Sequence, residues 1–220
     1  MDFKLIEGRI PKELYHVLEK EITHLRPSQE KSINKGLLDG KNLLVCTPTA
    51  SGKTLIAELA ALKSIIEKKG KAIYIVPLKA LASEKYRDFR RKYDKIAKIA
   101  LSIGDIDSSD PYLAEYDLII TTSEKLDSLT RHHAAWLSGI SVVIVDEIHL
   151  LNDQERGPTL EILLTILKKL LKNVQIIGLS ATIGNAEELA EWLKADLVVD
   201  EWRPVKLHKG VYLEGNIEFD

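Results

Sequence analysis

The chain has 220 residues, of which 45% are hydrophobic and 29% are charged, and its formal net charge is −2. The apolar content is sufficient for one packed domain and excludes a disordered or collagen-like chain. The near-neutral charge excludes a histone-like polycation, but it is compatible with a nucleic-acid binder that uses a few local contacts. The single cysteine, Cys46, excludes a disulfide framework and favours a reducing environment.

The sequence contains no segment that is suited to a membrane. No apolar run approaches the roughly 20 residues that a transmembrane helix needs. The first seven residues include two acids, Asp2 and Glu7, and no long apolar stretch follows them, so they do not form a signal peptide. We therefore expect a cytoplasmic protein without a membrane partner.

Short apolar runs alternate with longer segments of helical periodicity along the chain. In chain order, the expected elements are helix 11–22, helix 28–38, strand 42–46, helix 53–67, strand 72–76, helix 79–94, strand 98–101, strand 117–121, helix 122–129, strand 140–145, helix 159–171, strand 174–179, helix 186–193 and strand 197–199. The strands carry continuous apolar runs, which are typical of a parallel sheet that helices cover on both faces. A loop with Asp105, Asp107 and Asp110 follows strand 98–101.

These elements predict an α/β fold of three layers with a mostly parallel central sheet. We expect residues 1–200 to form this domain, with N-terminal helices in residues 1–40. Residues 201–220 are less regular, and we interpret them as a linker or as edge strands that leave the domain.

The most specific local signal is the segment TPTASGKT, which follows a predicted strand and precedes a predicted helix. This context is the one that a phosphate-binding loop requires. The residues expected to hold phosphates are Thr47, Pro48, Thr49, Ala50, Ser51, Gly52, Lys53 and Thr54. Lys53 would reach the β- and γ-phosphates, and the Thr54 hydroxyl would bind Mg²⁺. Thr47 stands where the general pattern has glycine, and the alternative interpretation is a turn with an incidental lysine.

Two carboxylates, Asp146 and Glu147, follow the apolar strand 140–145. Carboxylates are costly to bury without partners, and the carboxyl edge of a parallel sheet is where ligands bind in open α/β folds. Asp146 would bind Mg²⁺ largely through water, because this ion keeps much of its hydration shell. Glu147 would be catalytic together with Lys53, by orienting and polarising the water that attacks the γ-phosphate. A pair of solvated acids at the end of a strand is the alternative.

Together with other segments, these motifs resemble those of superfamily 2 helicases in both order and spacing. The matching segments are LRPSQ (25–29) for the Q motif, TPTASGKT for motif I, PLKALASEKYRDF (77–89) for motif Ia, TTSEKLDSL (121–129) for motif Ib, DEIH (146–149) for motif II and LSAT (179–182) for motif III. The segments LSATIGNAEELAEWL (179–193) and WRPVKL (202–207) resemble the Ski-type branch of the DExH-box helicases, and within it the Hjm-type DNA repair helicases of archaea. The resemblance extends from about residue 10 to residue 213.

This resemblance implies a RecA-like P-loop fold and an ATP hydrolase that uses ATP and Mg²⁺. It implies that Gln29 reads the adenine. It also implies that His149, Ser180 and Thr182 couple the nucleotide site to the strand-binding side. Lys79, Thr122 and Ser123 would contact the phosphates of one nucleic-acid strand. The run of basic residues Lys85, Arg87, Arg90, Arg91 and Lys92 is interpreted mostly as a solvated helix face.

The same resemblance implies a 3′-to-5′ DNA helicase that acts on single-stranded or branched DNA, at replication forks and in repair. An RNA helicase of the Ski-type branch is the alternative, and a nucleotide-dependent binding module without translocation is a further one. Helicases of this family combine two RecA-like lobes, and no segment after residue 182 resembles motifs IV, V or VI. We therefore interpret the chain as the N-terminal lobe of a longer helicase, poorly active without its second lobe.

Overall fold

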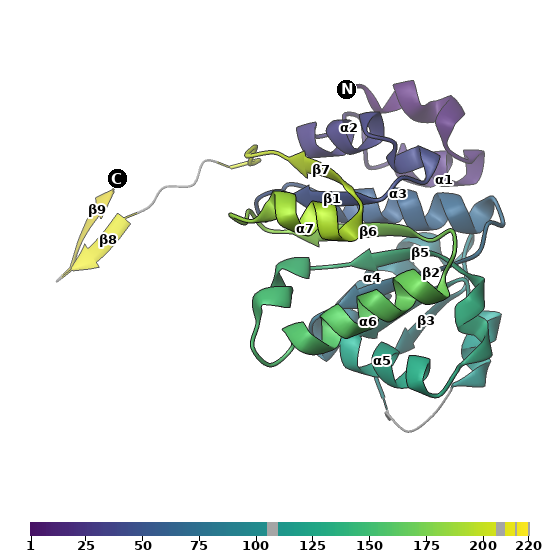
Figure 1. Ribbon diagram of the computed structural model, residues 1–220. Coiled ribbons are helices and arrows are strands. Elements are labelled where there is room, and N and C mark those ends of the chain that lie inside the picture. The colour runs from purple at the N-terminus through teal and green to yellow at the C-terminus, as the bar shows by residue number, and fades with distance from the viewer. Residues whose placement is uncertain (105–109, 206–209, 214, 220) are drawn as a thin grey trace.

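The apolar runs of the sequence form the strands of one seven-stranded sheet in the computed structural model, which describes residues 1–104, 110–205, 210–213 and 215–219 (Figure 1). These strands are β1 (Leu43–Cys46), β2 (Lys71–Val76), β3 (Ile99–Ser102), β4 (Leu118–Thr122), β5 (Ile140–Val145), β6 (Gln175–Ser180) and β7 (Asp196–Val199). Their order is β3-β4-β2-β5-β6-β1-β7, and every neighbouring pair is parallel. The carboxyl ends of the strands therefore share one edge of the sheet.

The segments of helical periodicity form seven α-helices in the described residues, which cover the two faces of the sheet. They are α1 (Lys12–Leu18), α2 (Pro27–Asn34), α3 (Lys53–Ile66), α4 (Lys79–Tyr93), α5 (Ser123–Arg131), α6 (Gly157–Leu170) and α7 (Ala186–Leu193). Short 3₁₀ helices lie at Phe3–Arg9 (η1), Leu37–Asp39 (η2), Pro111–Glu115 (η3), Ala135–Gly139 (η4) and Ile148–Asn152 (η5).

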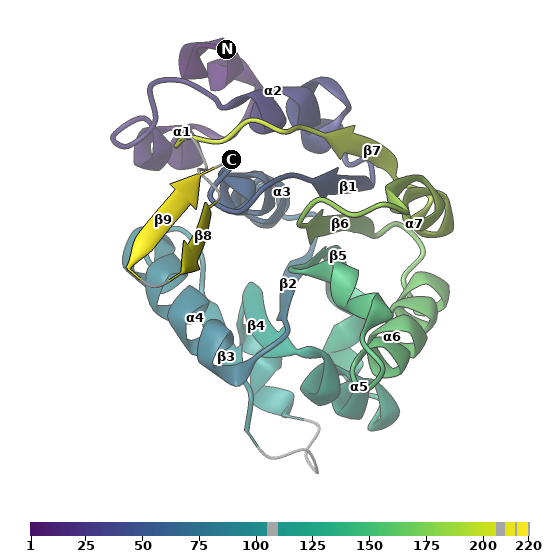
Figure 2. The same cartoon turned by 90° about the vertical axis from the view of Figure 1, so that its left-hand side faces the viewer.

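Two buried clusters lie on opposite faces of the sheet, because successive strand residues point to opposite sides. On β1, Leu43 and Val45 belong to the cluster under α1 to α4, whereas Leu44 and Cys46 belong to the cluster under α5 to α7. Figure 2 shows the sheet between these two groups of helices. The predicted three-layer architecture with a parallel sheet is confirmed.

Two N-terminal helices are shorter than the sequence suggested. The expected helix at 28–38 ends at Asn34, because Gly36 adopts a left-handed backbone with φ of 96° and a new 3₁₀ turn, η2, follows it. The expected helix at 11–22 ends at Leu18. The 3₁₀ helix η1, in which Phe3 and Ile6 are buried, was not predicted.

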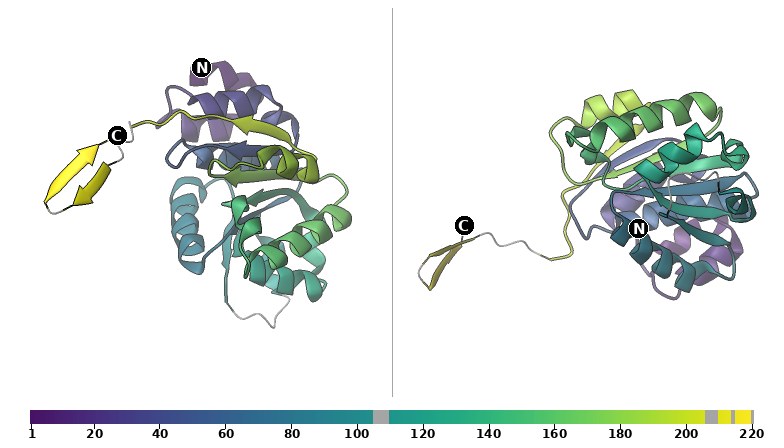
Figure 3. Two further views of the ribbon diagram at one scale, coloured as in Figure 1. Left: turned by 60° about the vertical axis from the view of Figure 1, so that its left-hand side comes forward. Right: turned by 90° about the horizontal axis from the view of Figure 1, so that it is seen from below.

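The C-terminal tail forms strands β8 (Gly210–Leu213) and β9 (Asn216–Phe219), which pair with each other in an antiparallel sheet of their own. This hairpin lies away from the seven-stranded sheet in both views of Figure 3. Asp105 and Asp107 of the aspartate-containing loop and residues 206–209 of the tail lie outside the described residues. Among the helices that the structure describes, none combines the length and apolar character needed to span a bilayer.

Candidate functional site

The phosphate-binding loop connects the end of β1 to the start of α3 at the carboxyl edge of the sheet. Ala50 and Gly52 bend it, with positive φ angles of 65° and 90°. The buried hydroxyls of Thr47 and Ser51 lie 2.7 Å apart and share a hydrogen bond. This bond explains how threonine is accommodated at the position where the general motif has glycine.

The ammonium of Lys53 is held by backbone carbonyls of the site itself. Its Nζ donates to the carbonyl oxygens of Thr47 and Ser180, at 2.9 Å each. Burial lowers the pKa of Lys53, and the nearby carboxylates of Glu147 and Asp146 oppose this shift. A half-buried cation held by exchangeable hydrogen bonds is suited to binding an anion such as phosphate.

Gln29 connects the N-terminus of α2 to the phosphate-binding loop. Its Oε1 accepts from the backbone N–H of Arg26 at 2.8 Å, and its Nε2 donates to the carbonyl of Gly52 at 2.9 Å. A Cβ at position 52 would lie only 2.5 Å from Gln29 Nε2, so the Gln29 amide would have to shift, and the positive φ favours glycine there. A cavity of about 350 Å³ opens beside Gln29, Gly52 and Thr54.

The two predicted carboxylates lie directly after β5, on the neighbouring part of the same edge. The backbone N–H of Asp146 donates to the carbonyl of Ile75, and Asp146 Oδ2 accepts from the Tyr74 hydroxyl at 3.0 Å. Glu147 has a left-handed backbone with φ of 53°, which is uncommon for a residue other than glycine. Such backbone strain is concentrated at functional sites, where the surrounding structure maintains it.

Lys85 is a site residue that the sequence interpretation missed. The basic run that contains it was interpreted mostly as a solvated helix face, and Lys85 is an exception, because its Nζ donates to Thr54 Oγ1 at 3.0 Å and lies 3.7 Å from Asp146 Oδ2. A signal for this was present in the sequence, because Lys85 lies three residues after Ala82 and four before Phe89, which are both buried. A lysine flanked at these spacings by core residues faces the interior side of its helix.

The rest of the basic run is divided between two environments. Lys92 is half-buried and pairs with Glu58 and Glu21, at 3.3 and 3.0 Å, so it is the second residue of the run that does not lie on a solvated face. The three arginines of the run, Arg87, Arg90 and Arg91, are exposed as expected. The positive charges that this run exposes to solvent are therefore those of the three arginines.

The residues expected to couple the two sides of the motor lie beside the carboxylates and the loop. His149, on η5, has its Nδ1 3.4 Å from Glu147 Oε2. The Ser180 hydroxyl is fully buried and lies close to the Cys46 thiol on the neighbouring strand. Thr182 is exposed in the loop after β6. His149 and Ser180 therefore adjoin the site directly, whereas Thr182 faces solvent.

The three residues expected to contact nucleic acid lie at helix N-termini on the carboxyl edge. Lys79 is exposed at the start of α4. Thr122 caps α5 through its hydroxyl, which accepts from the backbone N–H of Lys125 at 3.5 Å, and Ser123 is the first residue of α5. Both Thr122 and Ser123 are buried, so their side chains are less accessible to a strand than that of Lys79.

Curated relatives of this chain are archaeal proteins named ATP-dependent DNA helicase Hel308. The protein of Methanocaldococcus jannaschii is 60% identical over 207 residues, which are 90% of this chain and 17% of that protein. The proteins of Methanococcus vannielii and Pyrococcus horikoshii are 55% and 50% identical, over 90% and 96% of this chain and 27% and 29% of their own lengths. The chain thus spans less than a third of the length of these relatives.

A solved structure has the same fold, a parallel sheet covered by helices on both faces. The crystal structure of the DUF1998 helicase MrfA bound to DNA is similar with a TM-score of 0.73, over 88% of this chain and 30% of that chain, at 24% sequence identity. The DEAD/DEAH box helicase family matches residues 26–189, a range that includes the phosphate-binding loop, the DEIH segment and LSAT. Because this match covers most of the chain, the protein belongs to the DEAD/DEAH box helicase family.

Proposed function

We propose that this chain is the N-terminal, ATP-binding lobe of an ATP-dependent DNA helicase. The observation that carries the proposal is the arrangement of Lys53 and Thr54 opposite Asp146 and Glu147, at one edge of a parallel sheet. The charges of Glu147 and Asp146 both act on Lys53, so the two sequence motifs form one site. A phosphate-binding loop beside two carboxylates is the arrangement that phosphoryl-transfer enzymes of the P-loop class use.

Mg²⁺ fits the pair formed by Thr54 and Asp146. Hydroxyl and carboxylate oxygens are ligands that this ion accepts while it keeps several waters. The position already attracts a cation, because the Lys85 ammonium lies 3.0 Å from Thr54 Oγ1 and 3.7 Å from Asp146 Oδ2. When held by Thr54 and Asp146, Mg²⁺ would supply positive charge that offsets the negative charge of the phosphates during phosphoryl transfer.

The chain's own residues would then divide the work. Lys53 would exchange its two carbonyl partners for oxygens of the β- and γ-phosphates, since charge-assisted hydrogen bonds to phosphate are the stronger ones. Glu147, whose side chain is 38% exposed, would accept a hydrogen bond from the attacking water and polarise it. Gln29 would bind the adenine from the wall of the adjoining cavity, after releasing the Gly52 carbonyl.

A second RecA-like lobe is part of the proposal. In related hydrolases an arginine finger from outside the phosphate-binding lobe contributes about 10³–10⁵ in rate. We therefore expect His149, Ser180 and Thr182 to transmit the state of the nucleotide toward that lobe and toward the bound strand. Ser180 is placed to do so because its backbone carbonyl accepts from Lys53 Nζ at 2.9 Å.

We propose single-stranded or branched DNA as the nucleic-acid partner, with 3′-to-5′ movement and a role at replication forks and in repair. The name shared by the relatives at 50–60% identity, ATP-dependent DNA helicase Hel308, supports DNA over RNA. Lys79 and the N-termini of α4 and α5 would hold phosphates, which DNA and RNA have in common. An assay in which matched DNA and RNA strands compete to stimulate ATP hydrolysis shows which nucleic acid is the partner.

The central test is Glu147→Gln in a chain that also carries the second lobe. We expect ATP affinity within about two-fold of the parent and a fall in turnover of about 10²–10⁴, the usual contribution of a general base. The readouts are nucleotide binding and DNA-stimulated ATP hydrolysis. Glu155→Gln is the matched control, because Glu155 is exposed eight residues further along the chain and undergoes the same change of charge.

Two results would contradict the proposal. Normal turnover of the Glu147→Gln variant would remove the role of Glu147. The 220-residue chain alone provides the baseline, for which we expect weak nucleotide binding, very slow hydrolysis and no unwinding. Robust DNA-stimulated ATP hydrolysis by this chain alone would refute the requirement for a second lobe.

A further inference from the structure

Lys85 lies at the place where the proposed function requires a metal ion. It is in the middle of α4, a helix that sequence patterns connect to strand binding rather than to the nucleotide. Its Nζ is 3.0 Å from Thr54 Oγ1 and 3.7 Å from Asp146 Oδ2. These two oxygens come from different motifs, and the lysine is the group that bridges them.

The surroundings hold the Lys85 ammonium in place. The Tyr74 ring lies under it, with 5.6 Å between Nζ and the ring centroid, a geometry that favours a cation. The Tyr74 hydroxyl also donates to Asp146 Oδ2 at 3.0 Å, so the carboxylate is fixed from two directions. The Lys85 and Asp146 side chains are 23% and 15% exposed, and the ion pair is therefore only partly screened by water.

Lys53 does not perform this task, although it is the cation that the sequence motif supplies. Its Nζ donates to the carbonyls of Thr47 and Ser180. The bridge between the hydroxyl of Thr54 and the carboxylate of Asp146 is thus made by a residue outside the phosphate-binding loop.

An ammonium and a divalent cation repel each other and cannot share one pair of oxygens at these distances. We infer that Lys85 is a positioning residue that occupies the cation position between Thr54 and Asp146 in the nucleotide-free lobe, and that Mg²⁺ arriving with the nucleotide displaces it. This inference rests on the proposed function, which assigns Thr54 and Asp146 to Mg²⁺. It makes Lys85 a competitor of the metal for these two oxygens.

The displacement links the nucleotide site to α4. Lys79, the proposed strand contact, begins the same helix six residues before Lys85. A lysine that leaves the site when the metal binds changes the forces on one face of this helix. Occupancy of the nucleotide site is therefore sensed by an element that also faces the nucleic acid.

The test compares nucleotide affinity with and without Mg²⁺ in variants of residue 85. The probe is the fluorescent nucleotide mant-ADP, titrated in excess Mg²⁺ and again in EDTA. In Lys85→Met we expect the ratio of the two dissociation constants, EDTA over Mg²⁺, to rise about ten-fold, because the competitor of the metal is removed and the metal-free complex loses a cation. The Mg²⁺ concentration that gives half-maximal binding should fall accordingly.

Two further variants complete the design. Arg87→Met removes one positive charge from the exposed face of the same helix, and its ratio should equal that of the parent. Lys85→Gln keeps a hydrogen-bond donor for Thr54, and it provides the same comparison if the methionine variant does not fold. Thermal unfolding checks that each variant is folded.

The outcomes separate this inference from the proposed function. An unchanged or lowered ratio in Lys85→Met and Lys85→Gln, with Mg²⁺-dependent binding intact in the parent, overturns the role of Lys85 alone. Equal affinity of the parent and of Lys53→Ala, or no Mg²⁺ dependence in the parent, overturns the proposed function and the role of Lys85 with it.

Discussion

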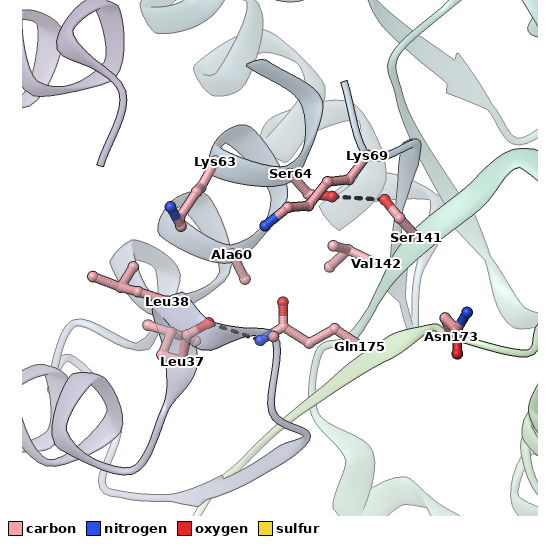
Figure 4. Close-up of a pocket in the computed structure, with 11 residues that line it drawn as sticks. Leu37, Leu38, Ala60, Lys63, Ser64, Lys69, Ser141, Val142, Asn173 and Gln175 are labelled. Carbon is pink, nitrogen blue, oxygen red and sulfur yellow. Dashed lines mark hydrogen bonds between the residues drawn. The ribbon is translucent and has the colours of Figure 1, made fainter. Parts of the chain in front are cut away.

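The two edges of the sheet both carry a hollow, but their chemistry differs. At the amino edge, a cavity of about 260 Å³ lies between α3 and the first residues of β5 and β6 (Figure 4). Its polar groups satisfy one another. The hydroxyls of Ser64 and Ser141 lie 2.7 Å apart, and Gln175 Nε2 donates to the carbonyls of Leu37 and Lys41.

At the carboxyl edge, charged side chains converge instead. The Lys85 ammonium lies 3.7 Å from Asp146 Oδ2, and the charges of Asp146 and Glu147 act on Lys53. Left-handed backbones do not separate the two edges, because Lys68, which precedes the cavity-lining Lys69, has one as well as Glu147. The comparison teaches that converging charges, rather than the size of a hollow, mark the candidate site.

The largest expected effect concerns the two lysines on α3 that lie at opposite edges. Lys53→Met should weaken mant-ADP binding about 100-fold or more, because one or two charge-assisted hydrogen bonds to phosphate are lost. Lys63→Met, which removes one of the two lysine partners of Glu67 beside the amino-edge cavity, should change the affinity less than about two-fold. Comparable losses in both variants would show that general positive charge, not the site, binds the nucleotide.

The second prediction compares two glycines with positive φ, Gly52 in the phosphate-binding loop and Gly40 at the amino-edge cavity. Gly40→Ala should cost about 1 kcal/mol, since a Cβ there meets nothing within 4 Å and only the left-handed backbone is penalised. Gly52→Ala should cost about 2–3 kcal/mol, because its Cβ would also lie 2.5 Å from Gln29 Nε2. Urea denaturation measures both free energies of unfolding.

A double variant sharpens this comparison. Gln29→Ala in the Gly52→Ala background removes the atom with which the new Cβ collides, so it should recover part of the lost stability. The same second change in the Gly40→Ala background should recover nothing. If the two glycine variants lose equal stability, Gln29 does not constrain the loop as the structure indicates.

The smallest effect concerns pH and two glutamates of the α3 region. Burial raises the pKa of Glu58, although Lys92 and Tyr93 oppose it. Burial also acts to raise the pKa of Glu67, but hydrogen bonds from Lys63 and Lys69 outweigh it and lower that pKa. Protonated Glu58 therefore stabilises the folded state below the ordinary glutamate pKa of about 4.3, and this contribution is lost as the pH rises above that value. Ionised Glu67 has the opposite effect, because its contribution is lost as the pH falls through its lowered pKa.

Glutamine variants give this contrast a measurable sign. Between pH 4 and pH 7, the free energy of unfolding of Glu58→Gln should rise relative to that of the parent. For Glu67→Gln it should fall relative to the parent, by about 0.5 kcal/mol or less because Glu67 is partly exposed. Denaturant unfolding at the two pH values measures both differences. Slopes of the same sign would contradict the opposite environments of the two carboxyls.

Much of the fold could be predicted because its signals are local. Buried parallel strands require continuous apolar runs, and each expected strand of the seven-stranded sheet lies within two residues of the observed one. The helix at 186–193 was predicted with its observed ends. The phosphate-binding loop and the DEIH segment are each one continuous stretch of sequence, so each can be found without the fold. The family match confirmed the class of protein that they indicated. The individual roles of the site residues remain predictions.

The failures share a physical cause, which is that local periodicity does not show what packs across an element. The helix that was expected to continue to residue 38 ends before Gly36, which has a left-handed backbone. Glycine adopts positive and negative φ about equally, and the pattern of apolar residues does not show which of them it takes. Lys85 looked like a surface charge, because its hydrogen-bond partner Thr54 is 31 residues away. The roles of Thr122 and Ser123 in binding phosphate stay predictions, and only the structure shows that both residues are buried.

The sequence by itself determined the order of strands and helices along the chain, the position of the loop that we expect to bind phosphates and the carboxylates that follow β5. These features depend on residues that are neighbours in the chain, so backbone preference and apolar pattern are enough to find them. Only the tertiary structure decided which oxygens each lysine meets: Lys53 donates to the carbonyls of Thr47 and Ser180, and Lys85 bridges Thr54 and Asp146. The physical reason is that ion pairing depends on distances of a few ångströms between side chains that the fold, not the chain order, brings together.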